Sequence, residues 1–319
     1  MIEKKVGMDS AIAFDIGGTS IKYALVDREG NILHRASVPS VDASEPLCDR
    51  IKRILRDLLT YAERHALTVR GIGAGVPSVV DGGKILFCNN LPELDNLQLD
   101  QLLAEFGLPV YIENDANVMG IGEVMYGAAR GYSDVVFLTV GTGIGGALFL
   151  NGTLYGGYRN RGTELGHILI HGSNGKPCTC GARGCLEAHA SVSALVATYR
   201  DLLTSRGKPL PERIDGAYIV ERYKQTEEEA CLALRDHLGN LALGVISLIN
   251  VFAPQKVVIG GGISESGEFY IQTLREMVNE QVMKETSQFT QIEAAALGNQ
   301  AGCLGAAALV FHHVKANEQ

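Results

Sequence analysis

The chain of 319 residues carries 28 Lys and Arg against 36 Asp and Glu, a net charge of −8, and 46% of its residues are hydrophobic. This composition excludes disordered, collagen-like and coiled-coil chains, and its acidity argues against a nucleic-acid partner. The length predicts about two domains, and the 38 glycines predict turns that bring backbone close to a ligand.

The first third of the chain alternates short apolar runs with glycine turns. Strands are predicted at 11–14, 21–27 and 32–38, which form an antiparallel meander because only short turns separate them. A helix is predicted over 44–65 with Ser44 as its N-cap. Strands at 71–76 and 110–113 and a short helix near 99–106 follow, and this alternation predicts parallel strand pairing.

The same order of elements recurs in the second half. Strands are predicted at 135–140, at 145–150 and from Thr153, then helices at 192–205 and 227–253 and strands at 256–259 and 292–296. The repeat predicts an α/β protein of two similar units with a ligand in the cleft between them. We expect a small domain of residues 1–117 plus about 302–319, and a larger one of 118–301 that carries a cysteine-rich loop.

Three glycine clusters each follow a predicted strand: Gly17-Gly18-Thr19, Gly141-Thr142-Gly143 and Gly260-Gly261-Gly262. Backbone N–H groups at such turns bind phosphate, and a Thr hydroxyl adds a donor, although each cluster alone also fits a simple hairpin. The run 141–146 matches G-x-G-x-x-G, but a strand rather than a helix follows it, which argues against a dinucleotide fold. We therefore expect hairpin turns to bind the phosphates.

Cys178, Cys180 and Cys185 lie within one short segment that follows His167. Three thiolates and one imidazole are the usual ligands of a closed structural zinc site. His171 is a competing fourth ligand, and free cysteines in a surface loop are the structural alternative. The segment predicts a zinc site.

Four motifs together resemble the ROK family of sugar kinases and sugar-responsive repressors: Asp15-Ile16-Gly17-Gly18-Thr19, Glu113-Asn114-Asp115, Glu164-Leu165-Gly166-His167, and the three cysteines followed by Leu186-Glu187. The resemblance spans nearly the whole chain and implies two ribonuclease-H/actin-like domains with a cleft between them. It also implies that Asp115 is the general base and that Asn114, Asp115, Glu164, His167 and Glu187 bind the sugar. His167 would then contact both the sugar and zinc.

The chemistry of the residues agrees with these roles. A sugar hydroxyl is a weak nucleophile, so a carboxylate such as Asp115 has to accept its proton, although Asp115 could instead cap the following helix. Asp15 is placed to hold Mg²⁺, and Ser78 and Asn90 either bind sugar hydroxyls or stabilise local turns. The expected ATP-phosphate residues are Gly17, Gly18, Thr19, Lys22, Gly141, Thr142, Gly143, Gly261 and Gly262, with Lys22 open to a solvated role.

The predicted function is an ATP-dependent hexose kinase that phosphorylates the 6-hydroxyl of an aldohexose, with glucose favoured by the resemblance. The alternatives are a kinase of N-acetylglucosamine, N-acetylmannosamine or another hexose, and a non-catalytic sugar-responsive regulator. The repressor branch needs a DNA-binding domain before the first glycine turn, and few residues precede Asp15. We therefore expect a kinase with ATP and sugar as ligands, and we expect a side chain at Gly143 to weaken ATP binding more than sugar binding.

The sequence also carries expectations about location. Residues 1–10 lack an apolar segment, and the mainly apolar run 241–254 is shorter than the roughly 20 residues that span a bilayer, so we expect a buried helix and no membrane partner. The crowded cysteines are unsuited to disulfides. We expect a cytoplasmic protein, and the resemblance implies a homodimer.

Overall fold

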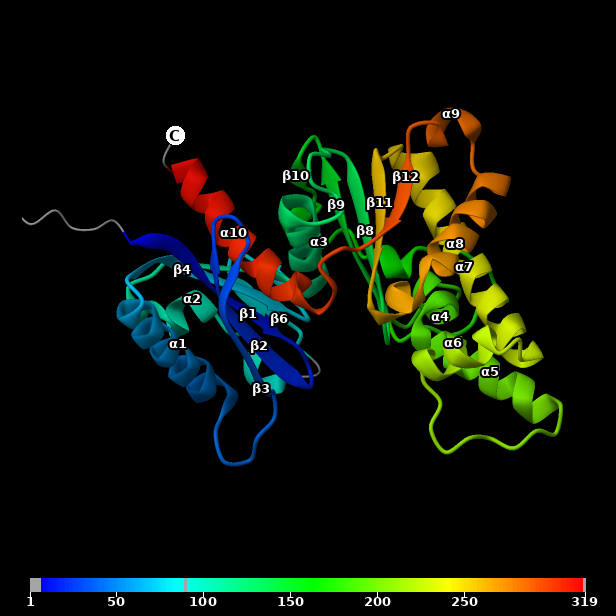
Figure 1. The fold of residues 1–319 in the computed structure, drawn as a ribbon, viewed down its shortest axis with the longest axis horizontal. Helices are drawn as coiled ribbons and strands as arrows, with labels where there is room; N and C mark the ends of the chain where they lie inside the picture. The colour runs from blue at the N-terminus through cyan, green and yellow to red at the C-terminus, as the bar shows by residue number, and fades with distance from the viewer. Residues whose placement is uncertain (1–6, 89–90, 318–319) are drawn as a thin grey trace, which may run out of the picture. The chain divides into compact units, whose positions relative to one another are not determined.

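A computed structural model of the protein describes residues 7–88 and 91–317 (Figure 1). The chain forms two compact units. Unit 1 comprises Met1–Gly131, Gly156–Gly162 and Asn299–Gln319, and unit 2 comprises Tyr132–Tyr155 and Thr163–Gly298. The domains expected from the sequence differ from these units at 118–131, 156–162 and 299–301, and as functional divisions they stay predictions.

Unit 1 is built on a five-stranded sheet in the order β3-β2-β1-β4-β7. Its strands are β1 (Met8–Ile16), β2 (Ser20–Asp27), β3 (Ile32–Pro39), β4 (Leu67–Val76) and β7 (Val110–Asn114). The first three pair antiparallel, whereas β4 runs parallel to both β1 and β7. The predicted meander and the parallel pairing after it are both confirmed.

Helices cover the two faces of this sheet. Ile72, Ala74 and Val76 of β4 belong to the apolar cluster that includes α1 (Leu47–Arg64), because alternate residues of a strand point to one face. On the other face, α10 (Ala301–Asn317) lies against β1, β4 and α3 (Asp115–Tyr126). A Cβ at Gly73 would meet the carbonyl of Ala306, so glycine is what allows this close approach.

The smaller elements of unit 1 connect these layers. They are the hairpin of β5 (Val79–Asp81) and β6 (Lys84–Leu86), the short helices η1 (Pro92–Leu94), α2 (Leu99–Leu102) and η2 (Ala104–Phe106), and η3 (Tyr158–Asn160). The short helix predicted near 99–106 is therefore two turns, α2 and η2. The predicted N-cap was wrong, because α1 begins at Leu47 after Pro46 and the Ser44 hydroxyl donates to Asp42 at 2.6 Å.

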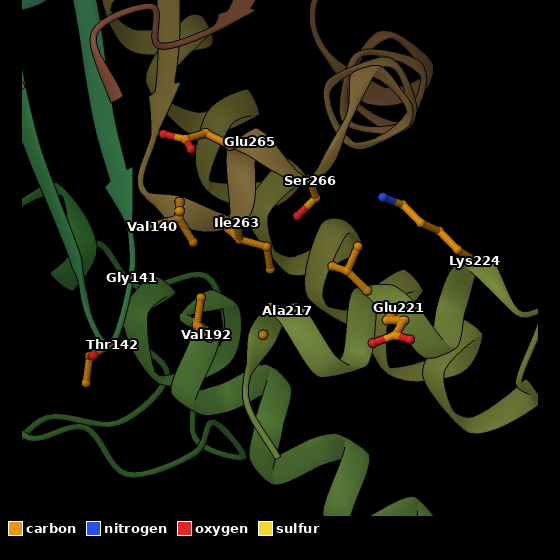
Figure 2. A pocket seen from close by; sticks show the side chains of 13 residues that line it. Val140, Gly141, Thr142, Val192, Ala217, Glu221, Lys224, Ile263, Glu265 and Ser266 are labelled. Carbon is orange, nitrogen blue, oxygen red and sulfur yellow. The ribbon is translucent and has the colours of Figure 1, made fainter. Parts of the chain in front are cut away.

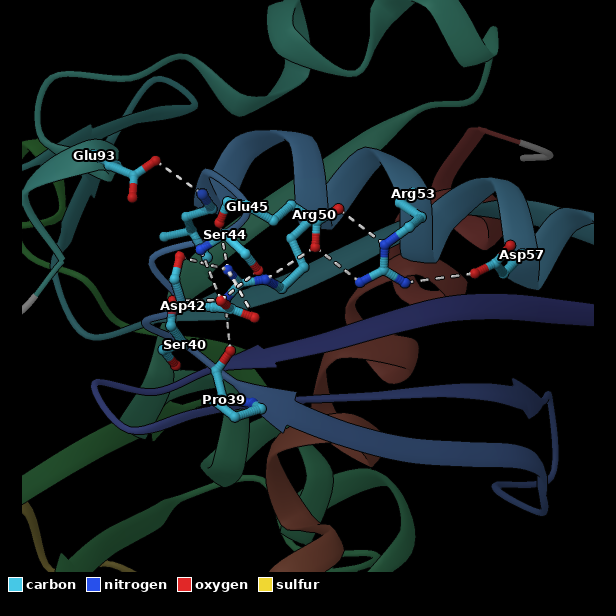
Figure 3. A network of polar contacts seen from close by, with 10 residues as sticks. Pro39, Ser40, Asp42, Ser44, Glu45, Arg50, Arg53, Asp57 and Glu93 are labelled. Carbon is cyan, nitrogen blue, oxygen red and sulfur yellow. Dashed lines mark hydrogen bonds and ion pairs between the residues drawn. The ribbon is translucent and has the colours of Figure 1, made fainter.

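A buried arginine stabilises the loop after β3 (Figure 3). Arg50 is 2% exposed and donates to the carbonyls of Pro39 at 2.7 Å and Ser40 at 3.1 Å. The Ser40 amide donates to the Thr19 carbonyl at 3.1 Å, and its hydroxyl donates to the carbonyl of Gly17. Arg50 thereby stabilises the first glycine turn through Ser40, which it binds directly.

Unit 2 repeats the sheet of unit 1, in the order β10-β9-β8-β11-β12. Its strands are β8 (Val135–Val140), β9 (Ile144–Leu150), β10 (Thr153–Leu154), β11 (Lys256–Gly260) and β12 (Gln291–Ala294). The β8–β9 and β9–β10 pairs are antiparallel, and β11 is parallel to both β8 and β12. The predicted internal repeat is confirmed in topology.

The helices of unit 2 are α4 (Leu186–Ala190), α5 (Val192–Ser205), α6 (Gly216–Lys224), α7 (Glu228–Phe252), α8 (Glu268–Gln281) and α9 (Lys284–Ser287), with short turns η4 (Leu165–His167) and η5 (Gly262–Ser266). Another short turn, η6, spans Gly298–Gln300. Among the described residues, α7 is long and apolar enough to cross a membrane, but 67% of its apolar window is buried within the fold. Residues 241–252 of the apolar run thus belong to a longer core helix, which ends before residues 253 and 254.

Candidate functional site

The first glycine turn joins β1 to β2 in unit 1. The Gly17 amide donates to the Ser20 carbonyl at 3.0 Å, which closes the turn. Asp15 is 7% exposed, and Lys22, its cross-strand partner, places its ammonium 3.4 Å from the Asp15 carboxylate. The structure therefore brings Asp15 and Lys22 together beside the turn. A carboxylate is a ligand that suits Mg²⁺, and a protein-bound Mg²⁺ usually keeps several waters.

The second glycine turn joins β8 to β9 in unit 2 and lies against the start of α5. The Gly141 carbonyl accepts from the Val192 amide at 2.8 Å, and the Thr142 carbonyl accepts from the Ser193 hydroxyl at 2.8 Å. These contacts hold the turn through its carbonyls. They leave the Thr142 side chain at the edge of a pocket.

That pocket, of about 660 Å³, lies within unit 2 (Figure 2). Its lining joins the second and third glycine clusters with α6 and η5, through Val140, Gly141, Thr142, Val192, Gly216, Ala217, Val220, Glu221, Lys224, Gly262, Ile263, Glu265 and Ser266. Apolar walls with a few polar groups and glycine turns at one side suit a nucleotide. Gly262 of this lining was predicted from the sequence, whereas the other η5 residues and the α6 residues were missed, because their sequences carry no motif.

The third glycine cluster divides its roles between neighbours. Gly261 has a φ of 89°, and a Cβ there would meet the carbonyl of Val140, so its backbone approaches β8 rather than the pocket. Gly262 lines the pocket, and a Cβ there would meet nothing within 4 Å. Of the two, Gly262 is therefore the one placed to approach a ligand.

Gly141 offers a direct test of the pocket. A Cβ at Gly141 would meet nothing within 4 Å, so Gly141→Val should fold and extend its side chain toward the space that a phosphate would use. We expect the KM for ATP to rise by roughly tenfold, the effect of one to two kcal/mol of steric cost, with little change in the KM for sugar. Steady-state kinetics measure both constants. Gly239→Val on α7, where a Cβ also meets nothing within 4 Å, is the matched control, and equal effects of the two variants would contradict the assignment.

Four metal-ligating side chains gather in unit 2. The ligand atoms of His167, Cys178, Cys180 and Cys185 all lie within 4.8 Å of one another. Cys178 Sγ is 3.6 Å from His167 Nδ1, and the sulfur atoms of Cys180 and Cys185 are 3.6 Å apart. This donor set and spacing fit a tetrahedral zinc ion.

Two thiols of the cluster have shifted pKa values. Burial and the neighbouring thiols raise the pKa of Cys185 to about 12, whereas hydrogen bonds from the Ala182 amide and from Cys178 lower the pKa of Cys180. Thiols crowded in this way ionise together only when a cation binds them. The competing ligand His171 lies elsewhere, because its Nε2 is 2.7 Å from the side-chain oxygen of Asn240.

Glu187, at the start of α4, connects the cysteine loop with the second glycine turn. Its carboxylate accepts from the Ile144 amide at 3.0 Å and from the Thr179 hydroxyl at 3.1 Å. A Cβ at Gly143 would meet this carboxylate. The expectation that a Gly143 side chain would act mainly on ATP is therefore revised, since Gly143→Val would displace a predicted sugar ligand as well. Glu164 is exposed and directly precedes η4, where the His167 amide donates to its carbonyl at 2.9 Å.

The remaining predicted sugar residues lie in unit 1, where β7 leads into α3. Asn114 is the N-cap, since its side-chain oxygen accepts from the Ala116 amide at 3.0 Å and the Asn117 amide at 3.3 Å, while its Nδ2 donates to the Ser78 carbonyl at 3.3 Å. The capping alternative for Asp115 was therefore wrong, and half-buried Asp115 is the first residue of the helix. Ser78 is 7% exposed, and its hydroxyl donates to the Leu86 carbonyl. Asn90 lies outside the described residues.

Glu113, one residue before Asn114, is a buried carboxyl within the Glu113-Asn114-Asp115 motif, and the sequence assigns it no role. Burial raises its pKa above the ordinary value of 4.5, although three amide hydrogen bonds oppose the shift. The folded protein therefore binds a proton here more tightly than the unfolded chain does.

This raised pKa predicts a pH effect on stability. As pH rises from 4.5 through the raised pKa of Glu113, wild-type protein should lose stability relative to Glu113→Gln, because the carboxyl must ionise in a buried site. Urea unfolding of both proteins across this pH range measures the difference. Unfolding free energies that stay parallel would contradict the assignment to Glu113.

Comparison with known proteins places these features in context. A model of the ROK family matches residues 11–313. The glucokinase of Thermotoga maritima is 36% identical over 95% of this chain and 98% of that protein. A solved ROK family glucokinase from Streptomyces griseus, in complex with glucose and AMPPNP, has a TM-score of 0.80 at 31% identity and covers 95% of this chain and 99% of that one. The xylose repressor of Bacillus spizizenii is 29% identical over 98% of this chain but only 79% of the repressor.

Proposed function

Because this chain belongs to the ROK family, we propose that it is an ATP-dependent hexose kinase that transfers the γ-phosphate of ATP to the 6-hydroxyl of glucose. The resemblance read from the motifs is confirmed by the family match, and the two-domain actin-like fold by the solved relatives. The observation that carries the choice of glucose is the similarity, over 95% of this chain, to a glucokinase solved with glucose and AMPPNP.

We propose sugar-binding roles for the residues that the sequence motifs indicate. Asp115 would accept the proton of the attacking hydroxyl, and Asn114, Ser78 and Asn90 would contribute further hydrogen bonds from unit 1. Glu164, His167 and Glu187 would bind sugar hydroxyls from unit 2. The support for Asp115 is its position as the half-buried first residue of α3, directly after the N-cap Asn114, where a carboxylate can accept a proton from a bound hydroxyl.

We assign the nucleotide to the unit 2 pocket and to the glycine turns. Gly141, Thr142 and Gly262 line the pocket, and the other proposed phosphate residues are Gly17, Gly18, Thr19, Lys22, Gly143 and Gly261. Asp15 would hold Mg²⁺ directly or through water. When bound, the ion neutralises charge on the phosphate oxygens.

Zinc would be held by His167, Cys178, Cys180 and Cys185, and its part would be structural. The support is the donor set within 4.8 Å. A zinc ion on one ring nitrogen of His167 would fix the orientation of the imidazole toward the sugar.

We also propose that the protein is cytoplasmic and that it assembles as a homodimer.

A coupled assay of ATP consumption tests the function. We expect turnover with glucose to exceed turnover with mannose, fructose, allose, N-acetylglucosamine and N-acetylmannosamine. Faster turnover with either N-acetylated sugar would show that this sugar, and not glucose, is the preferred substrate. Sugar binding by calorimetry with no turnover on any sugar would favour a regulator, the second candidate that similarity to a xylose repressor supports.

A further inference from the structure

A buried carboxylate precedes the proposed catalytic residue without any part in the chemistry proposed above. Glu113, at the end of β7, is 9% exposed. Its oxygens accept from the Asn114 amide at 2.8 Å, from Asn117 Nδ2 at 3.1 Å and from Asn160 Nδ2 at 3.2 Å. All three donors are neutral amides, so these three contacts are hydrogen bonds and not ion pairs.

Two of these donors belong to the start of α3, the helix turn that presents Asp115. Asn114 is the N-cap and Asn117 is in the first turn. One oxygen of Glu113 accepts from both of them. The carboxylate therefore restrains the N-terminal turn of α3 from the side of the sheet.

The third donor comes from a distant part of the chain. Asn160 belongs to the segment Gly156–Gly162, which packs within unit 1 and leads along the chain to Glu164. Arg159 and Asn160 have φ values of 55° and 54°, and Arg159 forms an ion pair with Asp81 at 2.8 Å. Residues with a side chain adopt this left-handed backbone less often than glycine does, and the Asp81–Arg159 and Glu113–Asn160 contacts help to hold the segment in it.

We infer that Glu113 is a positioning residue whose carboxylate holds the first turn of α3 and the segment Gly156–Gly162 in a single arrangement. The inference rests on the proposed function, because that function makes Asp115 the base and Glu164 a sugar ligand. Misplacing such groups by about 1 Å is enough to slow a reaction by roughly 100-fold.

A charge exchange across the Glu113–Asn160 contact tests the inference. Asn160→Asp places a second carboxylate against Glu113, and because residue 160 is exposed the variant should fold. We expect kcat/KM for glucose to fall by roughly tenfold with the KM for ATP unchanged. Adding Glu113→Gln supplies an amide donor to the new carboxylate and should restore most of the loss. Gln101→Glu, which also exchanges an exposed side-chain amide of unit 1 for a carboxylate but does not face another carboxylate, should have no effect.

Amide hydrogen exchange of residues 156–162 is a second measurement that does not depend on activity. Exchange should quicken in Asn160→Asp and return toward the wild-type rate in the double variant. Lack of restoration in the double variant would overturn the contact. Restored exchange with unchanged kinetics throughout would reduce Glu113 to a structural role and overturn the positioning inference. A wild-type protein that phosphorylates no sugar would instead refute the proposed function, while exchange would still decide the contact.

Discussion

Asp115→Asn is expected to lower turnover by roughly 10²- to 10⁴-fold, the loss typical of removing a general base. The local structure should persist, because Asp115 Oδ1 accepts from the Ala116 amide at 2.8 Å and an asparagine oxygen can accept in the same way. The Asn114 cap is also unaffected. The amide retains hydrogen bonding but cannot take up the hydroxyl proton.

The measurement is kcat with glucose and ATP at saturation, together with sugar affinity by calorimetry. Sugar affinity should stay close to that of wild type, because the proton is transferred only as the reaction proceeds and its loss lowers kcat rather than binding. Asp100→Asn makes the same chemical change on the surface of α2 and serves as the control. Turnover within a few-fold of wild type in Asp115→Asn would remove Asp115 from the chemistry.

Cys180→Ser is expected to release zinc and abolish sugar binding while ATP still binds. Cys180 is exposed, so the substitution leaves the apolar core intact and removes one thiolate from the cluster. The sugar residues should lose their arrangement because His167 is part of the cluster and Glu187 accepts a hydrogen bond from Thr179, the neighbour of Cys180. The proposed nucleotide pocket is lined by other segments, α6 and η5 among them.

Elemental analysis gives the metal content, and calorimetry with glucose and with AMPPNP separately gives the two affinities. Cys231→Ser on α7 makes the same chemical change outside the cluster and should retain both the metal and the sugar affinity. Full metal content in Cys180→Ser would show that Cys180 is not a ligand. Unimpaired sugar affinity after metal loss would separate the zinc site from the sugar site.

Much of the fold could be predicted from sequence because its signals are local. Period-two apolar runs separated by Asp15-Ile16-Gly17-Gly18-Thr19 and by Gly141-Thr142-Gly143 predict hairpins, and the hairpins were confirmed. The cysteine spacing likewise brings three thiols together within one short loop. Such features depend on residues that are close together in the chain, so a sequence pattern is enough to predict them.

Tertiary structure alone decided the features that join distant residues. The wall that α6 adds to the pocket, the Glu187 hydrogen bond to Ile144 and the Glu113 hydrogen bond to Asn160 each connect segments that are far apart in the chain. No periodicity or spacing encodes such pairs, because they depend on how sheets and helices pack once formed. The residue types of the candidate site could thus be predicted from the sequence, whereas the contacts that orient Glu187 and the start of α3 follow only from the packed structure.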